Sequence, residues 1–174
     1  ISKLNSKKIS KKQIILNSIH IEQNLNKENI GSQDQIATCS GGFNLINFSK
    51  NKTEINNLKK FRKNTSKIED SCLLFYSGKQ RESQKITKDL VKDIKLNKEY
   101  FNNIKDLTYE GLGLIKSKNF NIDEFGNVLK EAWYNKNIIS KKYTNYKINN
   151  LFEDSLKFGA TGFKMLGAGS EGFF

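Results

Sequence analysis

The chain has 174 residues, of which 36% are hydrophobic, and a formal net charge of +12. No run of 18 apolar residues could span a membrane and no signal peptide is evident, so we expect a soluble globular protein. Arginine occurs only as Arg62 and Arg81 and lysine is spread along the whole chain, so the charge does not predict nucleic-acid binding, which usually draws on the bidentate arginine fork.

The cysteine and histidine content excludes a zinc site. Cys39 and Cys72 lie far apart without a CxxC spacing, and His20 is the only histidine, so four ligands cannot be assembled. Two separated thiols fit a reducing compartment, and we expect a cytoplasmic protein. A Cys–His nucleophile pair stays open as an alternative, although a small buried cysteine is the commoner case.

Residues 9–26 predict a helix. At 100° per residue, Ile14, Ile21 and Leu25 fall on one side of it, and Ile15 and Ile19 extend the same apolar arc. Glu22 lies inside that arc. A carboxylate in such a place must be paired, hydrogen-bonded or metal-bound if it is buried. The pattern leaves a salt bridge to a lysine and a ligand role as alternatives.

Residues 30–48 predict a loop, a short helix, a glycine turn and a strand. Gly31 permits a sharp turn, and Asp34 follows between Gln33 and Gln35, which suggests an acid held between hydrogen-bonding amides. An aspartate after a glycine is more often a helix cap or a turn residue. The pattern alone therefore leaves Asp34 as either a structural or a chemical residue.

A polar, lysine-rich segment at 51–66, with a short edge strand at 54–58, marks the expected domain boundary. It divides the chain into residues 1–66 and 67–174.

A short apolar run at 71–76 predicts a buried strand that ends in a turn. Ser77 and Gly78 form the turn, and Arg81 stands near the start of the next helix. Helix N-terminal amides and a guanidinium together attract an anion. An ordinary strand-to-helix turn is the alternative.

Four helices follow, at 82–94, 98–116, 121–138 and around 148–156. The apolar stripe of the third helix, with spacing i, i+3, i+4, i+7 and i+8, is continued by Lys136. A lysine at the end of such a stripe usually extends its ammonium to water, and a role toward a ligand is the alternative.

The chain ends in the glycine-rich run GATGFKMLGAGSEGFF. Gly167, Gly169 and Gly172 match the G-x-G-x-x-G pattern of dinucleotide-binding proteins. We reject that interpretation because no βαβ unit and no acidic residue about 20 positions further on accompany the glycines.

Four of these stretches resemble the GHMP small-molecule kinases, and most closely their heptose- and fucose-type members. They are GSQDQ followed by GGFN, SGKQRES, EAWYNKNIIS and the final glycine run, in which Phe163, Ser170 and Glu171 replace glycines. The resemblance implies an α+β fold: the end of an N-terminal GHMP kinase lobe, then a C-terminal lobe of antiparallel strands packed with helices.

The resemblance also implies an activity and a set of site residues. The activity is ATP-dependent phosphorylation of a sugar phosphate. The first expected substrate is a heptose 7-phosphate, phosphorylated at its anomeric hydroxyl. Asp34 is expected to orient or deprotonate that hydroxyl, and Glu22 to hold the Mg²⁺ of ATP. Substrate contacts are expected from Gln33, Gln35, Ser77, Gly78, Arg81 and Lys136, and phosphate contacts from Gly167, Ala168, Gly169 and Gly172.

Three alternatives remain for the function: another GHMP sugar kinase, such as a fucokinase; a noncatalytic module that binds sugar phosphates or other anions; or a basic nucleic-acid binder. No phosphate-cradling loop precedes residue 31, and the chain has no initiating methionine. We therefore expect a fragment whose nucleotide site is incomplete and which has no kinase activity by itself.

Overall fold

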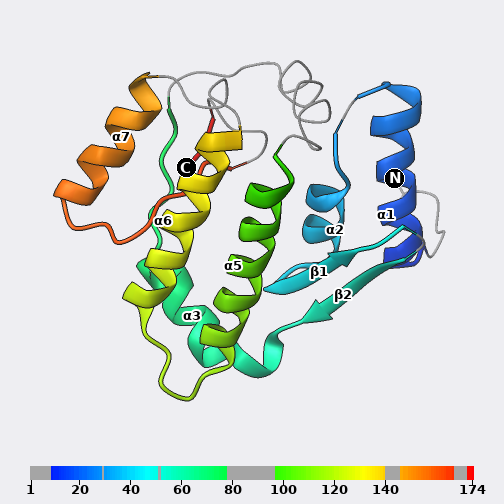
Figure 1. Cartoon of the computed structure of the whole chain (residues 1–174). Coiled ribbons are helices and arrows are strands. Elements are labelled where there is room, and N and C mark those ends of the chain that lie inside the picture. Colours follow the sequence, from blue (N-terminus) through cyan, green and yellow to red (C-terminus); the bar gives the residue numbers. More distant parts are fainter. Residues whose placement is uncertain (1–8, 29, 51, 78–96, 140–145, 167–171) are drawn as a thin grey trace. The chain divides into compact units, whose positions relative to one another are not determined.

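The protein is a mixed helix and strand structure that divides into two compact units. The computed structural model describes residues 9–28, 30–50, 52–77, 97–139, 146–166 and 172–174. Contacts group the chain into Ile1–Lys60 (unit 1) and Phe61–Phe174 (unit 2), so the division falls within the polar segment 51–66. Helices predominate, and unit 1 adds a two-stranded antiparallel sheet (Figure 1). This composition is consistent with the expected α+β class.

Unit 1 consists of two helices and a β-hairpin. Ser10 caps the first helix, because its hydroxyl accepts a hydrogen bond from the Gln13 backbone N–H at 3.2 Å. In the hairpin, Ile46 stands opposite Ile55. In chain order the elements are α1 (Lys11–Ile19), a π-helical turn (His20–Leu25), α2 (Gln33–Ser40), β1 (Asn44–Phe48) and β2 (Thr53–Asn57).

The turn between α2 and β1 depends on two glycines. Gly41 and Gly42 have φ angles of 66° and 69°, in the left-handed region that other residues avoid. The side-chain amide of Asn44 donates to the carbonyl oxygens of both glycines and holds this turn in place. The predicted order of loop, short helix, glycine turn and strand over residues 30–48 is confirmed.

The face of the first helix that the sequence predicted to be buried is buried only in part. Ile15 and Ile19, which extend the predicted arc, and Glu22 within it are half-buried, as are Ser18 and Gln23. Ile14, Ile21 and Leu25 are 42%, 49% and 64% exposed. The prediction failed at Ile21 and Leu25 because the helix does not keep 100° per residue to its end: residues 20–25 form a π-helical turn with wider hydrogen bonding.

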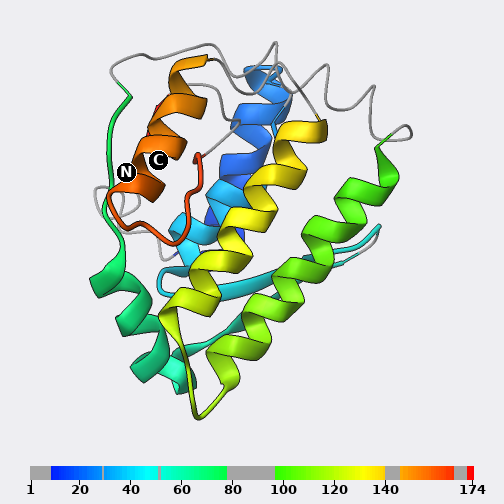
Figure 2. The ribbon, with the colours of Figure 1, turned by 60° about the vertical axis from the view of Figure 1, so that its left-hand side comes forward.

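Unit 2 is built mainly from helices (Figure 2). The α5–α6 pair forms an antiparallel hairpin, and Asn121 begins α6 by accepting a hydrogen bond from the Asp123 backbone N–H at 2.8 Å. The side-chain amide of Asn64 donates to the carbonyl oxygens of Ile115 and Ser117. These hydrogen bonds connect α3 (Arg62–Ser71) to the end of α5. A 3₁₀ turn (Lys59–Phe61) leads into α3 (Arg62–Ser71), α5 (Lys98–Lys116), α6 (Ile122–Ile139) and α7 (Tyr146–Lys157).

The helices predicted at 98–116 and 121–138 are confirmed by α5 and α6, and the fourth predicted helix by α7. The helix predicted at 82–94 lies outside the described residues. No helix in the described part of the chain is both long and apolar enough to cross a membrane.

An aromatic cluster forms the core of unit 2. The rings of Trp133 on α6 and Phe163 lie 5.0 Å apart, and the ring of Phe152 on α7 lies 5.4 Å from that of Phe163. The predicted apolar stripe of α6 is therefore confirmed as a core face. The buried members of this cluster are Trp133, Ile148, Phe152, Phe163 and Met165.

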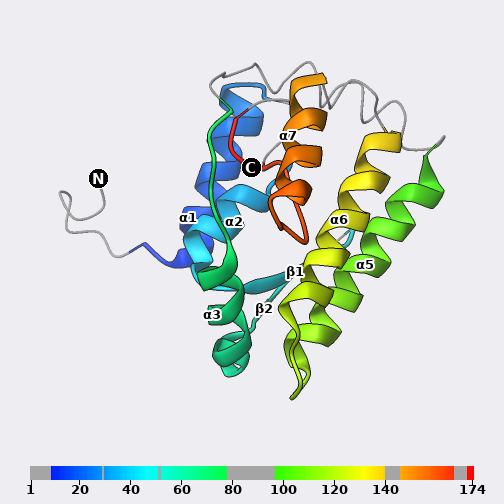
Figure 3. The same cartoon turned by 90° about the vertical axis from the view of Figure 1, so that its left-hand side faces the viewer.

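Two glycines let the chain after α7 run back along α6 (Figure 3). A Cβ atom on Gly126 would clash with the side chain of Thr161, and one on Gly162 would clash with the backbone of Gly126. This close approach places Phe163 against Trp133. The segment that continues toward Leu166 is thereby fixed next to α6.

Three extended segments of unit 2 form a small ribbon, which we call the three-segment ribbon. It consists of residues 73–77, 163–166 and 172–174. Phe75 and Phe174 exchange two backbone hydrogen bonds of 2.8 and 2.9 Å, and the Leu166 N–H donates to the Phe173 carbonyl oxygen at 2.9 Å. The strand predicted at 71–76 is reduced to one antiparallel bridge between Tyr76 and Phe173.

The prediction that this strand is buried was wrong. Leu73 and Leu74 are 78% and 67% exposed. An apolar run of this length indicates a strand, but the sequence does not show which neighbours cover it, and none of the described residues covers these two leucines.

Candidate functional site

In unit 1, the side chain of Glu22 is hydrogen-bonded to that of Gln35. The π-helical turn leaves Glu22 half-buried, and the Gln35 side-chain amide on α2 donates a hydrogen bond to its Oε2 atom. No ion pair joins Glu22 to a lysine among the described residues. The salt-bridge alternative for Glu22 therefore finds no support in the part of the chain that the structure describes.

Asp34 lies in the first turn of α2, where its carboxylate is exposed. A negative charge there is favoured by the N-terminal end of the helix dipole. The expected cradle around it differs from the structure, because Gln33 is exposed while Gln35 is buried and directed to Glu22. Consecutive helical residues point about 100° apart, so two flanking glutamines cannot both face the acid between them.

The surroundings of Glu22 suit a hard cation in part. Its Oε1 atom has no hydrogen-bond partner among the described residues, and neither has the buried Oε1 of Gln35. Magnesium commonly binds one or two carboxylates and completes its shell with phosphate oxygens and water. Among the described residues, no group of three or more His, Cys, Asp or Glu side chains could hold a metal ion.

In unit 2, the structure brings together two sequence motifs that are 95 residues apart. The backbone N–H of Gly172 donates to the Ser77 hydroxyl at 2.8 Å, and the Ser77 N–H donates to the Gly172 carbonyl oxygen at 2.8 Å. Gly172 has a φ angle of 114°, which side chains rarely allow. The SGKQRES stretch and the glycine-rich run therefore meet at one point of the three-segment ribbon.

The structure does not describe several of the residues that the resemblance assigns to the site. Those that lie outside the described residues are Gly78, Arg81, Gly167, Ala168 and Gly169.

Lys136 lies half-buried near the C-terminal end of α6, one turn after Trp133. Burial, together with repulsion from the Lys164 ammonium, lowers the pKa of Lys136 to about 8. The sequence singled out Lys136 but not Lys164. A sequence pattern could have indicated the position of Lys164, because it lies between the apolar residues Phe163 and Met165. Both of these side chains are buried, and in an extended segment the side chain between them points to the opposite, exposed side.

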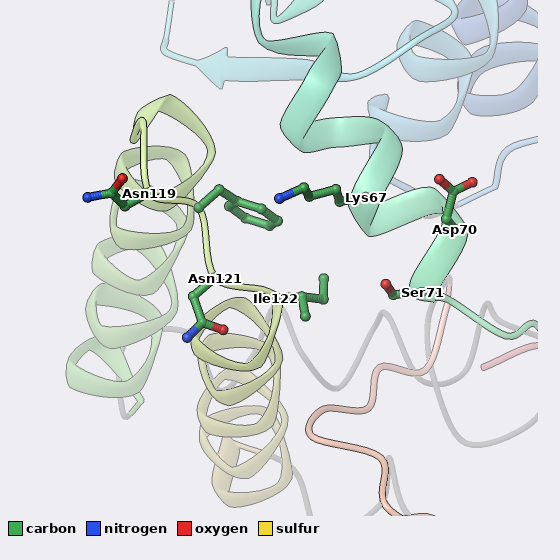
Figure 4. Close-up of a pocket in the computed structure, with 7 residues that line it drawn as sticks. Lys67, Asp70, Ser71, Asn119, Asn121 and Ile122 are labelled. Atoms are coloured by element: carbon green, nitrogen blue, oxygen red, sulfur yellow. The ribbon is translucent and has the colours of Figure 1, made fainter.

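A separate open pocket of about 590 Å³ lies between the end of α3 and the turn that joins α5 to α6 (Figure 4). Lys67 points from α3 toward this turn, while Asn121 is engaged in capping α6. None of the expected site residues lines it. The lining residues are Lys67, Asp70, Ser71, Asn119, Phe120, Asn121 and Ile122.

Comparison with known proteins gives one informative similarity. No family model matches the chain. Over 147 residues, or 82% of its length, the chain is 30% identical to the D-glycero-alpha-D-manno-heptose 7-phosphate kinase of Campylobacter jejuni. The chain spans 42% of the length of that relative. This distant similarity to a sugar-phosphate kinase supports in part the resemblance that the motifs predict.

Proposed function

We propose that the protein carrying this chain phosphorylates D-glycero-D-manno-heptose 7-phosphate at its anomeric hydroxyl, with ATP as the donor. The similarity over 147 residues to a kinase of that name carries the proposal. In the reaction the anomeric oxygen attacks the γ-phosphorus of ATP, the bond from that phosphorus to the ADP oxygen breaks, and the hydroxyl proton leaves.

Asp34 is proposed to act on the attacking hydroxyl. Its exposure at the start of α2 leaves the carboxylate accessible to a substrate. Phosphoryl transfer depends mainly on positioning and on neutralising charge, so we assign Asp34 the orientation of the hydroxyl and the acceptance of its proton. Gln33, exposed beside it, would contact the sugar.

Glu22 is proposed to hold the Mg²⁺ that accompanies ATP. The hydrogen bond from Gln35 fixes one carboxylate oxygen and leaves the other as a ligand. The ion would supply charge neutralisation at the transferred phosphate. Gln35 then positions Glu22. This positioning role replaces the direct sugar contact that the resemblance implied for Gln35.

In unit 2 the paired motifs are proposed to contact phosphate. The Ser77–Gly172 hydrogen bond supports a shared site for SGKQRES and the glycine-rich run. Backbone N–H groups of a glycine loop bind phosphate oxygens, and an arginine adds a bidentate contact. The contacts proposed on this basis come from Gly78, Arg81, Gly167, Ala168, Gly169 and Gly172.

The two-lobe organisation belongs to the same proposal. Residues 1–66 would be the end of the N-terminal kinase lobe and residues 67–174 the C-terminal lobe. Unit 1 and unit 2 divide within six residues of that boundary.

Phosphorus NMR of the full protein that carries this chain, incubated with Mg-ATP and heptose 7-phosphate, tests the proposal. We expect ADP and a new anomeric phosphate signal, and a much slower reaction with fucose. Faster turnover of fucose would favour the fucokinase alternative. Binding of heptose 7-phosphate without turnover would contradict the enzymatic proposal and favour a noncatalytic module.

A further inference from the structure

The pocket between the end of α3 and the turn that joins α5 to α6 lies between elements that are tied together outside it (Figure 4). The Asn64 side chain donates to the carbonyl oxygens of Ile115 and Ser117 at 2.9 and 2.8 Å, which holds α3 against the end of α5. The volume of about 590 Å³ falls in the range of about 300 to 1,000 Å³ that small-molecule sites occupy. The pocket is therefore large enough for an organic ligand and not only for an ion.

Two apolar residues form one wall of this pocket. Phe120 is 8% exposed, and its ring lies 6.2 Å from that of Phe125, so its position is fixed by packing. Ile122, the first residue of α6, is half-buried. A ligand that covers the remaining exposed surface of this wall removes apolar area from water, which favours binding.

Polar groups from α3 face the turn and this wall. Figure 4 shows Lys67 pointing toward the turn and the Ser71 side chain directed toward Ile122. Lys67 and Ser71 are spaced i, i+4, so they are neighbours on one face of α3. Neither side chain has a hydrogen bond or an ion pair among the described residues. An ammonium and a hydroxyl that are both available as donors suit an anionic oxygen.

Asp70 is the only carboxylate among the described residues that line the pocket, and it does not neutralise Lys67. The two residues are spaced i, i+3 on α3, which permits an ion pair, but none joins them. Figure 4 shows the Asp70 carboxylate on another side of α3 from the Lys67 ammonium. Further positive charge comes from Lys63, one turn before Lys67, and from Lys118 in the turn, both exposed. The charge that α3 directs toward the turn is therefore positive.

We propose that this pocket binds a small organic anion, a carboxylate or a phosphate ester. Lys67 and the Ser71 hydroxyl bind the anionic group, and Phe120 and Ile122 contact the apolar body of the ligand. The site is independent of the proposed function, because none of the residues assigned to phosphoryl transfer lines this pocket. Carboxylates and phosphate esters share the charge that Lys67 recognises, and the test separates them.

The test titrates the isotopically labelled 174-residue chain with ligands that share a phenyl ring and differ in charge. They are benzoate, phenyl phosphate, benzyl alcohol and phenylalanine: a carboxylate, a phosphate ester, a neutral alcohol and a zwitterion. Ionic strength is held constant, and NMR shifts of the backbone amides of residues 119–122 report binding in the pocket. Lys67→Met removes the ammonium.

Lys105→Met is the matched control, because Lys105 is an exposed lysine of the same unit that does not line the pocket. It lies in α5, about three turns before the end of that helix that adjoins the pocket. Methionine is a good helix former, so both variants should keep the fold, which circular dichroism and thermal unfolding check first. Should Lys67→Met fail to fold, Lys67→Gln gives the same comparison.

We expect benzoate or phenyl phosphate to bind at least about fivefold more tightly than benzyl alcohol and to shift the amides of residues 119–122. Lys67→Met should weaken this binding by about fivefold, the scale of an exposed charge contact, and Lys105→Met should leave it unchanged. Ser71→Ala should weaken it by about twofold. The more tightly bound of the two anions identifies the anionic group.

Equal binding of benzyl alcohol and the two anions would overturn the proposal, and so would amide shifts confined to other parts of the chain. Equal weakening by Lys67→Met and Lys105→Met would also overturn it, because it would reflect only the general attraction of a chain of charge +12. In the proposed site Asp70→Asn does not weaken the binding of benzoate. If phenylalanine binds most tightly and Asp70→Asn abolishes that binding, the pocket is a site for a zwitterion and the proposal is wrong.

Discussion

The two units differ in how firmly they hold their candidate site residues. In unit 1 the described buried side chains are Gln35, Ile36 and Leu58, and its two carboxylates of interest lie half-buried or exposed on short helices. Unit 2 places Lys136 one turn after the core residue Trp133, and two glycines allow the segment that contains Phe163 to pack against α6. Positioning in unit 2 therefore comes from packing, while in unit 1 it depends on single hydrogen bonds such as that between Gln35 and Glu22.

The largest effect should come from filling the close approach in unit 2. Gly126→Ala places a Cβ against Thr161, in a contact that only a shift of α6 or of the following segment can relieve. We expect a loss of about 2 to 4 kcal/mol in the free energy of unfolding, measured by urea denaturation. The aromatic core and Lys164 should lose their fixed positions together.

Gly113→Ala is the matched control for this change. Gly113 also lies inside a helix, α5, but an added Cβ would meet nothing within 4 Å. The same substitution should raise the free energy of unfolding by about 0.5 to 1 kcal/mol, because alanine favours the helix. If both variants are stabilised, the segment 161–163 does not pack against α6.

Removing the charge of Lys136 should have the next largest effect, and it should stabilise the protein. The pKa of Lys136 falls from 10.5 to about 8 on folding, so below pH 8 the folded state holds a partly desolvated charge. Lys136→Met should raise the free energy of unfolding at pH 7 by about 1 to 3 kcal/mol.

The pH dependence gives the sign of this effect. Between pH 8 and 10.5 the unfolded chain binds more protons at this position than the folded chain, so wild-type stability rises with pH. The advantage of Lys136→Met should shrink across the same window. A variant that is less stable than the wild type at pH 7 would mean that the ammonium stabilises the fold, against the account given for α6.

The smallest effect should appear in unit 1, at the two glutamines of α2. Gln35→Met leaves the Glu22 carboxylate without its amide partner and should lower the free energy of unfolding by about 1 kcal/mol. Gln33→Met changes an exposed side chain on the same helix and should have almost no effect. Equal effects at the two positions would show that the Gln35–Glu22 hydrogen bond does not hold unit 1 together.

Local patterns predicted the helices of unit 2 well, because a 3.6-residue period fixes both an element and its buried face. The stripe that ends in Trp133 and Lys136 is the clearest case. The π-helical turn at 20–25 was not predictable, because its hydrogen bonding depends on what the turn packs against. This is why Ile21 and Leu25 are more exposed than predicted, whereas Ile15 and Ile19, which lie before the turn, are half-buried as part of the predicted face.

Residues whose roles depend on distant neighbours were also missed. The alternation of Phe163, Lys164 and Met165 shows which side of its segment Lys164 occupies, but not which helix lies beside that segment. Gly126 and Gly162 bring the segment along α6, and no periodicity contains that information. Similarly, the pairing of Gln35 with Glu22 crosses two elements, and the sequence suggested Asp34 as the partner instead.

The central claim is that Asp34 acts in phosphoryl transfer, and Asp34→Asn in the full protein that carries this chain tests it most directly. Asp123→Asn is the control, because Asp123 is also an exposed aspartate in the first turn of a helix, α6. We predict that Asp34→Asn lowers the rate of ATP-dependent phosphorylation of heptose 7-phosphate by at least about a hundredfold, while Asp123→Asn keeps it. Near wild-type turnover in Asp34→Asn, or an equal loss in both variants, would contradict the account.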